Sequence, residues 1–462
     1  MSAATLAAEI RAGTRRAVDV VEERLADIAA RNTAFNAFTE VTADRARAEA
    51  AAVDAKVAAG QDPGLLAGVP VAVKNLFYLK GITTLAGAKI ERDTPPATAD
   101  AFLVRQMQSQ GAVMLGALNM DEYAYGFTTE NAHFGPSHNP HDLTRMAGGS
   151  SGGSAVAVAG GLVPITLGSD TNGSIRVPAS LCGIWGLKPT YGRLSRQGSL
   201  LFAASFDHLG PFARELMDLA LAYNVLQGED RDDPAQHWVG KQLVRPDPEI
   251  GDLRIAVADD HFARGGHAEA FAAVEAVARA LGATRRVSIP DAGMARAAAF
   301  LITMAEGANL HLPNLRTRPD DFDFATRDRF LAGALLPAHW VQQAQRVRAA
   351  YRAKALRVFD DVDVILAPAT PYVAPQIGQN MIEVEGVSIP VRPNLGVYTQ
   401  PISCIGLPVI AAPMADPVGL GTPGGMPIGV QLIAAPWTED KLFRVAAALE
   451  KLGVCASPAV RN

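Results

Sequence analysis

The spacing of apolar residues changes several times along the chain, and each change predicts a different element. Residues 3–58 repeat apolar positions at helical spacing, as in VDVVEERLADIAARN. This pattern predicts an N-terminal helical arm over residues 1–60, used for packing or for subunit contact. From Gly68 the segment GVPVAVKNLFYL is almost wholly apolar, which is typical of a buried strand. The segment VRQMQSQGAVMLGALNM predicts a helix followed by a short strand.

Beyond residue 210, helical patterns alternate with short apolar strands. FARELMDLALAYNVLQG and AFAAVEAVARALGA have helical spacing, whereas DLRIAVAD, DVILAPA, PVIAAP and IGVQLIAAP are short apolar runs. Alternation of this kind predicts an α/β fold. The polar, proline-rich stretches at 228–250 and 414–427 predict surface loops, and the chain contains no internal repeat.

Composition favours a soluble, enzyme-sized protein. The chain has 462 residues, of which 49% are hydrophobic and 19% charged, and its net charge is −5. This charge gives no electrostatic reason to expect nucleic acid or an anionic membrane as a partner. Cys182, Cys404 and Cys455 match no metal spacing, and the N-terminus lacks the pattern of a signal peptide, so a cytoplasmic protein is expected. The apolar stretch 154–169 contains glycines and Pro164, which favour buried core over a membrane span.

Lys74 follows VPVAV and precedes Leu76 and Phe77, an apolar setting for a charged side chain. Burial of an unpaired charge is costly, so such a lysine tends either to find a partner or to lose its proton. One interpretation is therefore a salt-bridged or snorkelling lysine. The other is a neutral lysine in a dry cavity, which would serve as a general base near pH 7.

The segment GGSSGGS, Gly148 to Ser154, allows three functional interpretations. It begins like a phosphate-binding loop, but Ser154 stands where that motif requires lysine. It also fits the G-x-S-x-G elbow with Ser151 as nucleophile, although the preceding HNPHDLTRMA predicts a poor strand. In the third interpretation the loop positions hydroxyl groups beside a separate nucleophile. A flexible linker is disfavoured because the apolar AVAVAGGLVPITLG follows directly.

Ser174 lies in the turn GSDTNGSIRVPAS, which supplies successive main-chain N–H groups such as an oxyanion hole needs. Without other features this segment would be an ordinary turn. The nearby His133, His138 and His141 have no tight metal-ligand spacing and are interpreted as loop or capping residues.

Lys74, GGSSGGS and DTNGSIRVPASLCGIWGLKPTYGRLS, taken in this order, resemble the amidase signature family. GALNMDEYAYGFTTEN, PATP, GLPVIAAP and GMPIGVQLIAAPW extend the resemblance over nearly the whole chain, and it is weakest at about 228–300. The resemblance implies a single α/β domain over 1–462, with a central mixed β-sheet flanked by helices on both faces. Residues 68–200 would form its catalytic core and 228–300 a more variable segment. No metal and no cofactor are expected.

The same resemblance implies a Ser–cis-Ser–Lys catalytic triad. Its nucleophile falls on Ser174, its base on Lys74, and its bridging serine, preceded by a cis peptide bond, on Ser150. The family's oxyanion hole falls on the main-chain amides of Thr171, Asn172, Gly173 and Ser174. Its supporting positions fall on Ser151, Asp170 and Arg176.

The expected chemistry follows from the weak acidity of a serine hydroxyl, which cannot attack an amide unaided. Neutral Lys74 would accept a proton through Ser150 as Ser174 attacks the carbonyl, and the relay would then protonate the leaving nitrogen. Two departures from the family pattern leave the triad intact. Asn75 stands where many members have Asp, and Asn172, where many have Gly, places a side chain beside the oxyanion site.

Within the family, AYGFTTENAHFGPSHNPHD, AAAFLITMAEGANLHLPNLRTRPDDFD and RPNLGVYTQPIS resemble the carboxybiuret hydrolases of bacterial cyanuric acid and s-triazine breakdown. This likeness implies hydrolysis of 1-carboxybiuret with release of ammonia, and oxamate and malonamate are alternative substrates. A small anionic substrate needs a cationic or donor-rich pocket. The candidates for this pocket are Tyr125, Arg316, Arg392, Thr399 and Gln400.

Partners are also implied by resemblance. The carboxybiuret branch implies a homodimer in which each copy binds a small helical partner subunit, giving a heterotetramer. The chain also resembles the amidase subunit of the tRNA-dependent amidotransferase, but its net charge of −5 does not call for tRNA. Neither nucleic acid nor a membrane is therefore expected as a partner. A catalytically inactive scaffold is disfavoured because all three triad positions are filled.

Overall fold

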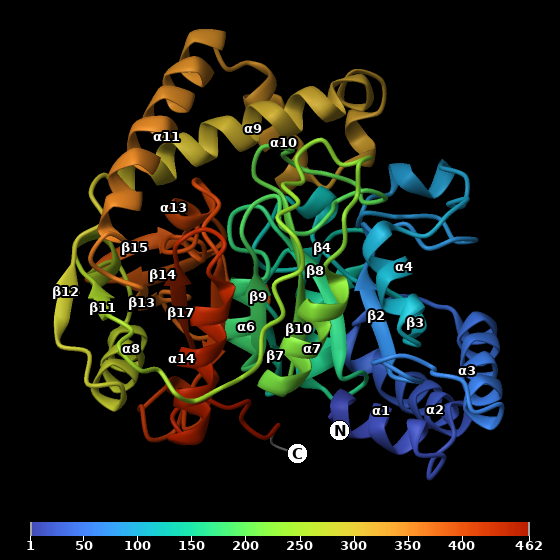
Figure 1. Ribbon diagram of the computed structural model, residues 1–462. Helices are drawn as coiled ribbons and strands as arrows, with labels where there is room; N and C mark the ends of the chain where they lie inside the picture. Colours follow the sequence, from blue (N-terminus) through green and yellow to red (C-terminus); the bar gives the residue numbers. More distant parts are fainter. Residues whose placement is uncertain (1, 461–462) are drawn as a thin grey trace.

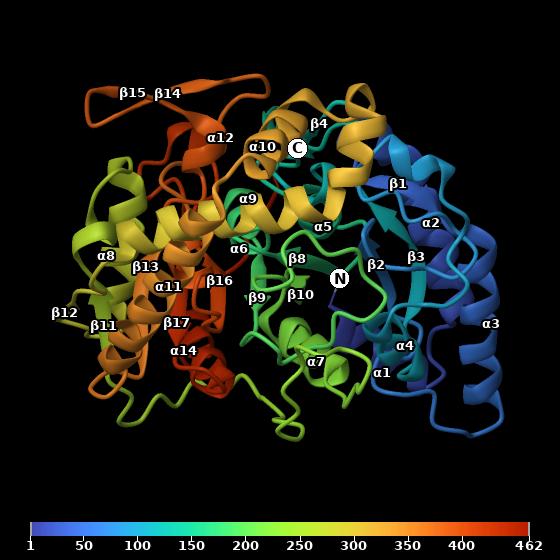
Figure 2. The same cartoon turned by 90° about the horizontal axis from the view of Figure 1, so that it is seen from above.

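An eleven-stranded mixed β-sheet runs through the protein, as the computed structural model of residues 2–460 shows (Figures 1 and 2). The strand order is β1-β3-β2-β8-β10-β9-β16-β17-β13-β11-β12. In that order the strands are Phe38–Val41, Val113–Leu118, Pro70–Lys74, Ile165–Asp170, His208–Ala213, Trp185–Lys188, Val409–Pro413, Gly429–Ala434, Val364–Pro368, Ile255–Ala258 and Arg285–Val287. The predicted α/β fold with a mixed central sheet is confirmed.

Helices cover the sheet, and the alternation of its side chains shows that both faces are buried. In β2, Val71 and Val73 join the larger apolar cluster, whereas Ala72 joins a second cluster on the opposite face. The helices are α1 Ala3–Arg11, α2 Ala17–Phe35, α3 Ala43–Ala58, α4 Phe102–Ser109, α5 Gly152–Ala159, α6 Arg176–Cys182, α7 Leu216–Leu226, α8 Ala268–Ala280, α9 Ala292–Thr317, α10 Phe324–Ala334, α11 Ala338–Val358, α12 Val391–Asn394, α13 Gln400–Ser403 and α14 Glu439–Lys451.

Short 3₁₀ helices and three two-stranded sheets lie outside the main sheet in residues 2–460. The 3₁₀ helices are η1 Ile90–Asp93, η2 Glu122–Ala124, η3 Asp260–Ala263, η4 Pro319–Asp321 and η5 Pro423–Gly425. Small two-stranded sheets pair β4 Glu130–Asn131 with β5 Gly135–Pro136, β6 His138–Asn139 with β7 Asp142–Met146, and β14 Met381–Val384 with β15 Val387–Pro390.

One local expectation from the sequence was wrong. The N-terminal arm is not wholly helical, because β1 lies between α2 and α3 and pairs antiparallel with β3 at the sheet edge. Only Phe38 of its four residues is buried, so β1 has no apolar alternation to reveal it. The segment before the glycine loop does form a strand, β7, but it pairs with β6 alone, outside the main sheet.

The direction of the strands determines where a site can form. β2 and β8 are parallel, and the antiparallel steps through β10, β9, β16 and β17 give β9 and β17 the direction of β8. The carboxyl ends of β2, β8, β9 and β17 therefore lie along the same border of the sheet, called here its carboxyl edge, which is formed by strand ends and not by an outer strand. Ligands in open α/β sheets bind in crevices outside such carboxyl ends.

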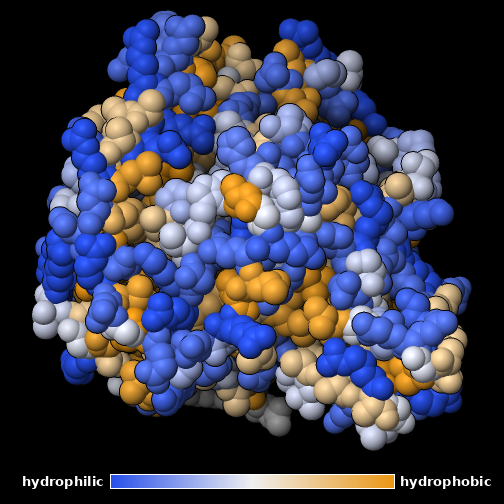
Figure 3. All heavy atoms as spheres, in the orientation of Figure 1, coloured by the Kyte–Doolittle hydropathy of each residue, from blue (hydrophilic) through white to orange (hydrophobic). Residues whose placement is uncertain are grey.

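Within residues 2–460, no helix is both long enough and apolar enough to cross a membrane. The apolar stretch 154–169 forms most of α5 and β8 and is buried except at Gly161. On the face seen in Figure 3, hydrophilic residues predominate and apolar residues form separate patches.

Candidate active site

Lys74 is the last residue of β2, where the strand carries it into the core at the carboxyl edge of the sheet. Its side chain is fully buried, and its Nζ lies 2.7 Å from Ser150 Oγ and 2.9 Å from Ser169 Oγ. Burial lowers the pKa of Lys74 to about 7, against the opposing field of Asp121, Asp207 and Asp170. A substantial fraction of Lys74 is therefore a neutral amine at neutral pH, as a proton acceptor must be.

Ser150 is positioned by glycines that let the main chain pass close to its neighbours. The Gly149–Ser150 peptide bond is cis. A Cβ at Gly149 would lie 2.1 Å from Asp121 Oδ2, so no other residue fits there without displacement. The hydroxyl of the next residue, Ser151, donates to Ser169 O at 3.1 Å and accepts from Ser169 N at 3.3 Å. Ser151 thus fixes the end of β8 and is already hydrogen-bonded.

Ser174 lies in the turn between β8 and α6, and it is only 2% exposed. Asp170 and Arg176 bracket this turn with two hydrogen bonds of 2.9 Å, and Asp170 also accepts the N–H of Ile175 at 3.2 Å. Although burial opposes ionisation of Asp170, the guanidinium of Arg176 holds its pKa well below the usual range. The pair is a fixed buried ion pair that holds the ends of the turn together.

The turn itself presents free N–H groups. Within residues 2–460, the main-chain N–H groups of Thr171, Asn172, Gly173 and Ser174 have no acceptor in the protein. Gly173 has φ +142°, and a Cβ there would lie 2.2 Å from Thr399 Oγ1. Thr171 donates its hydroxyl to Asp207 Oδ1 at 2.6 Å. The geometry therefore offers donors to an oxygen that develops negative charge beside Ser174.

A narrow cavity of about 20 Å³ adjoins Ser174. In this conformation it has room for little more than one water molecule. None of the residues that line it is acidic. The lining residues are Ala124, Tyr125, Gly126, Phe127, Thr171, Asn172, Ser174, Phe202, Phe300, Arg329, Pro393 and Gln400.

Several buried polar atoms at this cavity have no hydrogen-bond partner. They are the hydroxyl of Tyr125, the Nε2 of Gln400 and the Oδ1 of Asn172. Gln400 is oriented by Arg296, whose Nε donates to its Oε1 at 2.9 Å. The Nδ2 of Asn172 is directed at Thr303 Oγ1, 3.4 Å away. Unpaired buried polar groups are costly, so these three atoms favour a polar ligand.

Only two of the five predicted pocket residues line the cavity. Tyr125 and Gln400 line the cavity. Thr399 does not line it; its hydroxyl donates to Asn172 O at 2.7 Å and so supports the turn that carries Ser174. Arg316 was wrongly expected in the pocket, since it is exposed on α9. Arg392 was also misplaced, because it is directed at Glu130 and is absent from the cavity wall.

The cavity's arginine, which no pattern in the sequence indicated, is Arg329 on α10. Its Nε and Nη2 donate to the carbonyls of Ala325 and Tyr125 at 2.7 and 2.6 Å, and its guanidinium lies 4.1 Å from the Tyr125 ring centroid. Within residues 2–460 no carboxylate forms an ion pair with it. Burial lowers the pKa of Arg329, but an arginine keeps its charge. A partly buried cation without a carboxylate partner, beside the turn that carries Ser174, is suited to an anionic substrate.

Within the same residues, no group of three or more His, Cys, Asp or Glu side chains is arranged to hold a metal ion. His133 instead contacts Glu122 and His138 contacts Leu143 O, at 3.1 and 2.6 Å. His141 Nε2 lies 3.2 Å from Cys182 O. All three cysteines are free and buried.

Comparisons with known proteins identify the family of this chain. The amidase family model matches residues 19–443, and the chain belongs to this family. It is 53% identical to the AtzE subunit of the 1-carboxybiuret hydrolase of Pseudomonas sp. (strain ADP), with 96% of this chain and 97% of that protein aligned. It is 38% identical to a glutamyl-tRNA(Gln) amidotransferase subunit from Anaeromyxobacter sp. (strain K), with 95% and 94% covered.

Among solved structures, an inhibitor-bound complex of an s-triazine catabolic enzyme, described as an unexpected vestigial protein complex, matches with a TM-score of 0.97. The two chains are 52% identical, and each is covered completely. The prediction of an enzyme that hydrolyses the C–N bonds of amides is confirmed.

Proposed function

We propose that this protein hydrolyses a small carboxylated amide, 1-carboxybiuret, and releases ammonia through an acyl-enzyme on Ser174. The observation that carries this proposal is the cavity beside Ser174, which contains the unpaired Arg329 and no acidic residue. Such a cavity favours a substrate that carries a carboxylate and no positive charge. The 53% identity to a 1-carboxybiuret hydrolase subunit supports the choice within that class.

The proposed mechanism uses the groups at the carboxyl edge of β2 and β8. Ser174 attacks the amide carbonyl while its proton passes to Ser150, whose own proton passes to neutral Lys74. The N–H groups of Asn172, Gly173 and Ser174 would stabilise the oxyanion. The protonated relay then delivers a proton to the leaving nitrogen, and ammonia departs. Water hydrolyses the acyl-enzyme by the reverse relay.

The free polar atoms of the cavity fit a carboxybiuret better than a simpler acid amide. Carboxybiuret has N–H groups between its carbonyls, and Asn172 Oδ1 is a free acceptor for one of them. Gln400 Nε2 is a free donor for a carbonyl. The Nδ2 of Asn172 is directed at Thr303, so the free atom that this side chain offers to a substrate is the acceptor Oδ1. Oxamate and malonamate also carry a carboxylate but lack these internal N–H groups, and they remain the alternative substrates.

A glutamine-dependent amidotransferase is the alternative from another class, supported by the 38% identity to such a protein. Glutamine carries an α-ammonium group, which a binding site usually pairs with a carboxylate. The residues that line the cavity supply none. The cavity therefore favours the hydrolase.

Ammonia release from one enzyme preparation tests the proposal. The panel is 1-carboxybiuret, biuret, oxamate, malonamate, glutamine and a long-chain fatty amide. We expect the highest kcat/KM for 1-carboxybiuret. If glutamine or the neutral fatty amide is the best substrate, the proposal fails, although the assignment of Ser174 could survive.

We further propose that the protein is a cytoplasmic homodimer whose copies each bind a small helical partner subunit. The support is that the matching s-triazine catabolic enzyme is described as a protein complex. Analytical ultracentrifugation of the chain, alone and co-expressed with the product of any neighbouring small open reading frame, is the test. A monomer under both conditions would rule this assembly out.

A further inference from the structure

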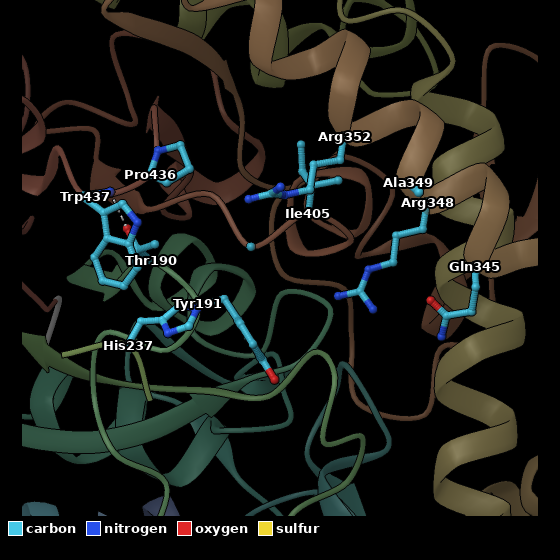
Figure 4. Close-up of a pocket in the computed structure, with 11 residues that line it drawn as sticks. Thr190, Tyr191, His237, Gln345, Arg348, Ala349, Arg352, Ile405, Pro436 and Trp437 are labelled. Carbon is cyan, nitrogen blue, oxygen red and sulfur yellow. Dashed lines mark hydrogen bonds between the residues drawn. The ribbon is translucent and has the colours of Figure 1, made fainter. Parts of the chain in front are cut away.

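A second cavity, of about 420 Å³, opens at the same edge of the sheet as the Ser174 turn (Figure 4). Two of its walls follow strands that end at this edge, with Thr190 and Tyr191 after β9 and Pro436 and Trp437 after β17. The opposite wall is one face of α11. This face presents Gln345, Arg348, Ala349 and Arg352, spaced three and four residues apart. The cavity thus occupies the kind of crevice in which α/β sheets bind ligands.

The side chains that line this cavity carry positive charge, and Glu306, which accepts the hydroxyl of Ser205 behind the cavity wall, is a carboxylate whose field acts on Arg348. Arg348 and Arg352 lie one helical turn apart, where like charges repel each other. No lining residue is acidic. Within residues 2–460, neither arginine forms an ion pair with a carboxylate, and Arg352 is exposed. An anion bound between them would relieve the repulsion.

The wall that faces the arginines is aromatic. In Figure 4, Arg348 and Arg352 extend from α11 toward Tyr191, His237 and Trp437. Trp437 has φ +68°, an unfavourable conformation for a bulky residue, and its main-chain N–H donates to Thr190 Oγ1 at 2.9 Å. Aromatic rings opposite two guanidinium groups suit a flat ligand with negative charge at its edge.

We propose that this cavity is a second ligand site, which binds a small planar dianion such as an aromatic or heteroaromatic dicarboxylate. It shares no lining residue with the cavity at Ser174. The proposal therefore does not depend on which amide the enzyme hydrolyses.

Arg348 connects the two cavities. Its Nη1 and Nη2 donate to Ser205 Oγ and Ser205 O at 3.1 and 2.6 Å. Ser205 belongs to the segment that contains Phe202, which lines the Ser174 cavity, and Asp207, which accepts the Thr171 hydroxyl. A ligand that draws Arg348 away from Ser205 would loosen this segment. The second site is thus an effector site for the reaction at Ser174.

Calorimetric titration of the full-length enzyme tests the binding, with isophthalate as the planar dianion and benzamide as the neutral planar probe. Isophthalate should bind, and benzamide should bind at least about tenfold more weakly. Arg352→Gln should weaken isophthalate binding about tenfold or more. Arg346→Gln, an exposed arginine of α11 outside the cavity wall, is the matched control and should change binding less than about twofold.

Three results would overturn the proposal. The first is the absence of isophthalate binding at millimolar concentration. The second is binding that Arg329→Gln abolishes and Arg352→Gln leaves intact, which would place the anion in the Ser174 cavity. The third concerns the effect of the ligand on catalysis. If the proposal holds, saturating isophthalate changes kcat/KM at least about twofold in the unmodified enzyme and leaves it unchanged in Arg352→Gln. Equal effects in both proteins would exclude an effector role for this cavity.

Discussion

The hydroxyl of Thr399 donates to the carbonyl of Asn172 at 2.7 Å, so the segment leading into α13 supports the turn that carries Ser174. Arg176 reinforces this link, because its Nη1 donates to Thr399 O at 3.1 Å while its other nitrogens bind Asp170. The free N–H groups of the turn are thus aimed by a residue more than two hundred positions away in the sequence.

Thr399→Val should therefore lower kcat by about tenfold and leave KM nearly unchanged, because a misaligned oxyanion turn weakens binding of the transition state alone. Steady-state ammonia release measures both constants. Thr166→Val is the matched control, since it removes a buried hydroxyl that donates to Ser154 O at 3.0 Å, at the far end of β8. Equal losses of kcat in the two variants would mean that Thr399 acts only through stability.

Lys74 should set the acidic limb of the pH–rate profile. Its pKa is lowered to about 7 from an ordinary value of 10.5, and only the neutral amine accepts a proton. We expect kcat/KM to rise with pH and to level off above a midpoint near 7. Lys74→Met should lose about 10³-fold or more in kcat. A pH profile that is flat from 5 to 9 would show that Lys74 is not the base.

The same residue makes stability depend on pH. Between pH 7 and 10.5 the unfolded chain keeps a proton on Lys74 that the folded chain has lost, so the free energy of unfolding rises with pH through this window. Lys74→Met removes this contribution. In urea titrations, the free energy of unfolding of Lys74→Met should exceed that of the unmodified protein most at or below pH 7. This difference should shrink toward pH 10.5. A difference that is constant with pH would contradict the lowered pKa.

The three residues of the proposed triad were assigned from the sequence by resemblance to the amidase signature family, and each also lies in a local pattern that is compatible with its role but does not establish it. Lys74 interrupts an apolar strand, Ser150 lies among glycines, and Ser174 follows Gly173 in a turn of small residues. The sheet order and the hydrogen bond from Lys74 to Ser150 could not be predicted in this way. They depend on contacts between segments that are separate in the sequence, 76 residues apart for Lys74 and Ser150, about which local spacing carries no information.

Ser174 and Ser151 can be separated by one pair of variants. Ser174→Ala should lower kcat by about 10⁴-fold or more, because no nucleophile remains. Ser151→Ala should keep most of the activity, since its hydroxyl is occupied by Ser169 and serves to position β8. Mass spectrometry after acid quenching should find an acyl group on the Ser174 peptide. An acylated, active Ser174→Ala protein and an inactive Ser151→Ala protein would reverse the assignment.

Asn172 should discriminate between substrates with and without internal N–H groups. Asn172→Gly removes the free Oδ1 acceptor and should lower kcat/KM for 1-carboxybiuret about tenfold, the effect of roughly 1.4 kcal/mol. Malonamate has a methylene group in place of an internal N–H, so its kcat/KM should change less than about threefold. Equal losses for both substrates would show that Asn172 supports the turn without contacting the substrate.

The pocket was less predictable than the triad, and the arginines show why. Arg316 and Arg329 are both helical arginines, and nothing in the local sequence shows which one faces the catalytic turn. The distinction arises from how α10 packs against α9, which leaves Arg316 exposed and Arg329 over the ring of Tyr125. Tyr125 and Gln400 were predicted because they lie in segments that resemble the family, whereas α10 carried no such resemblance.

Arg329 should be the residue that recognises the substrate carboxylate. Arg329→Gln should lower kcat/KM for 1-carboxybiuret about 10- to 150-fold, mainly through KM, because a hydrogen bond to a charged group contributes roughly 1.5–3 kcal/mol. Neutral biuret should be affected much less. Arg329→Lys keeps the charge and should recover part of the loss for 1-carboxybiuret. Arg316→Gln, on the exposed face of α9, is the control and should match the unmodified enzyme.

Arg329 also donates to Ala325 O and Tyr125 O, so its replacement could act by disturbing α10. The ratio of kcat/KM for 1-carboxybiuret to that for biuret separates the two causes. If Arg329 binds the carboxylate, its replacement lowers this ratio, because biuret has no carboxylate that could lose the contact. If Arg329 is only structural, its replacement lowers both kcat/KM values together and leaves the ratio unchanged. The unfolding temperature then shifts by the same amount in Arg329→Gln and Arg329→Lys. An unchanged ratio in both variants would exclude Arg329 from substrate recognition.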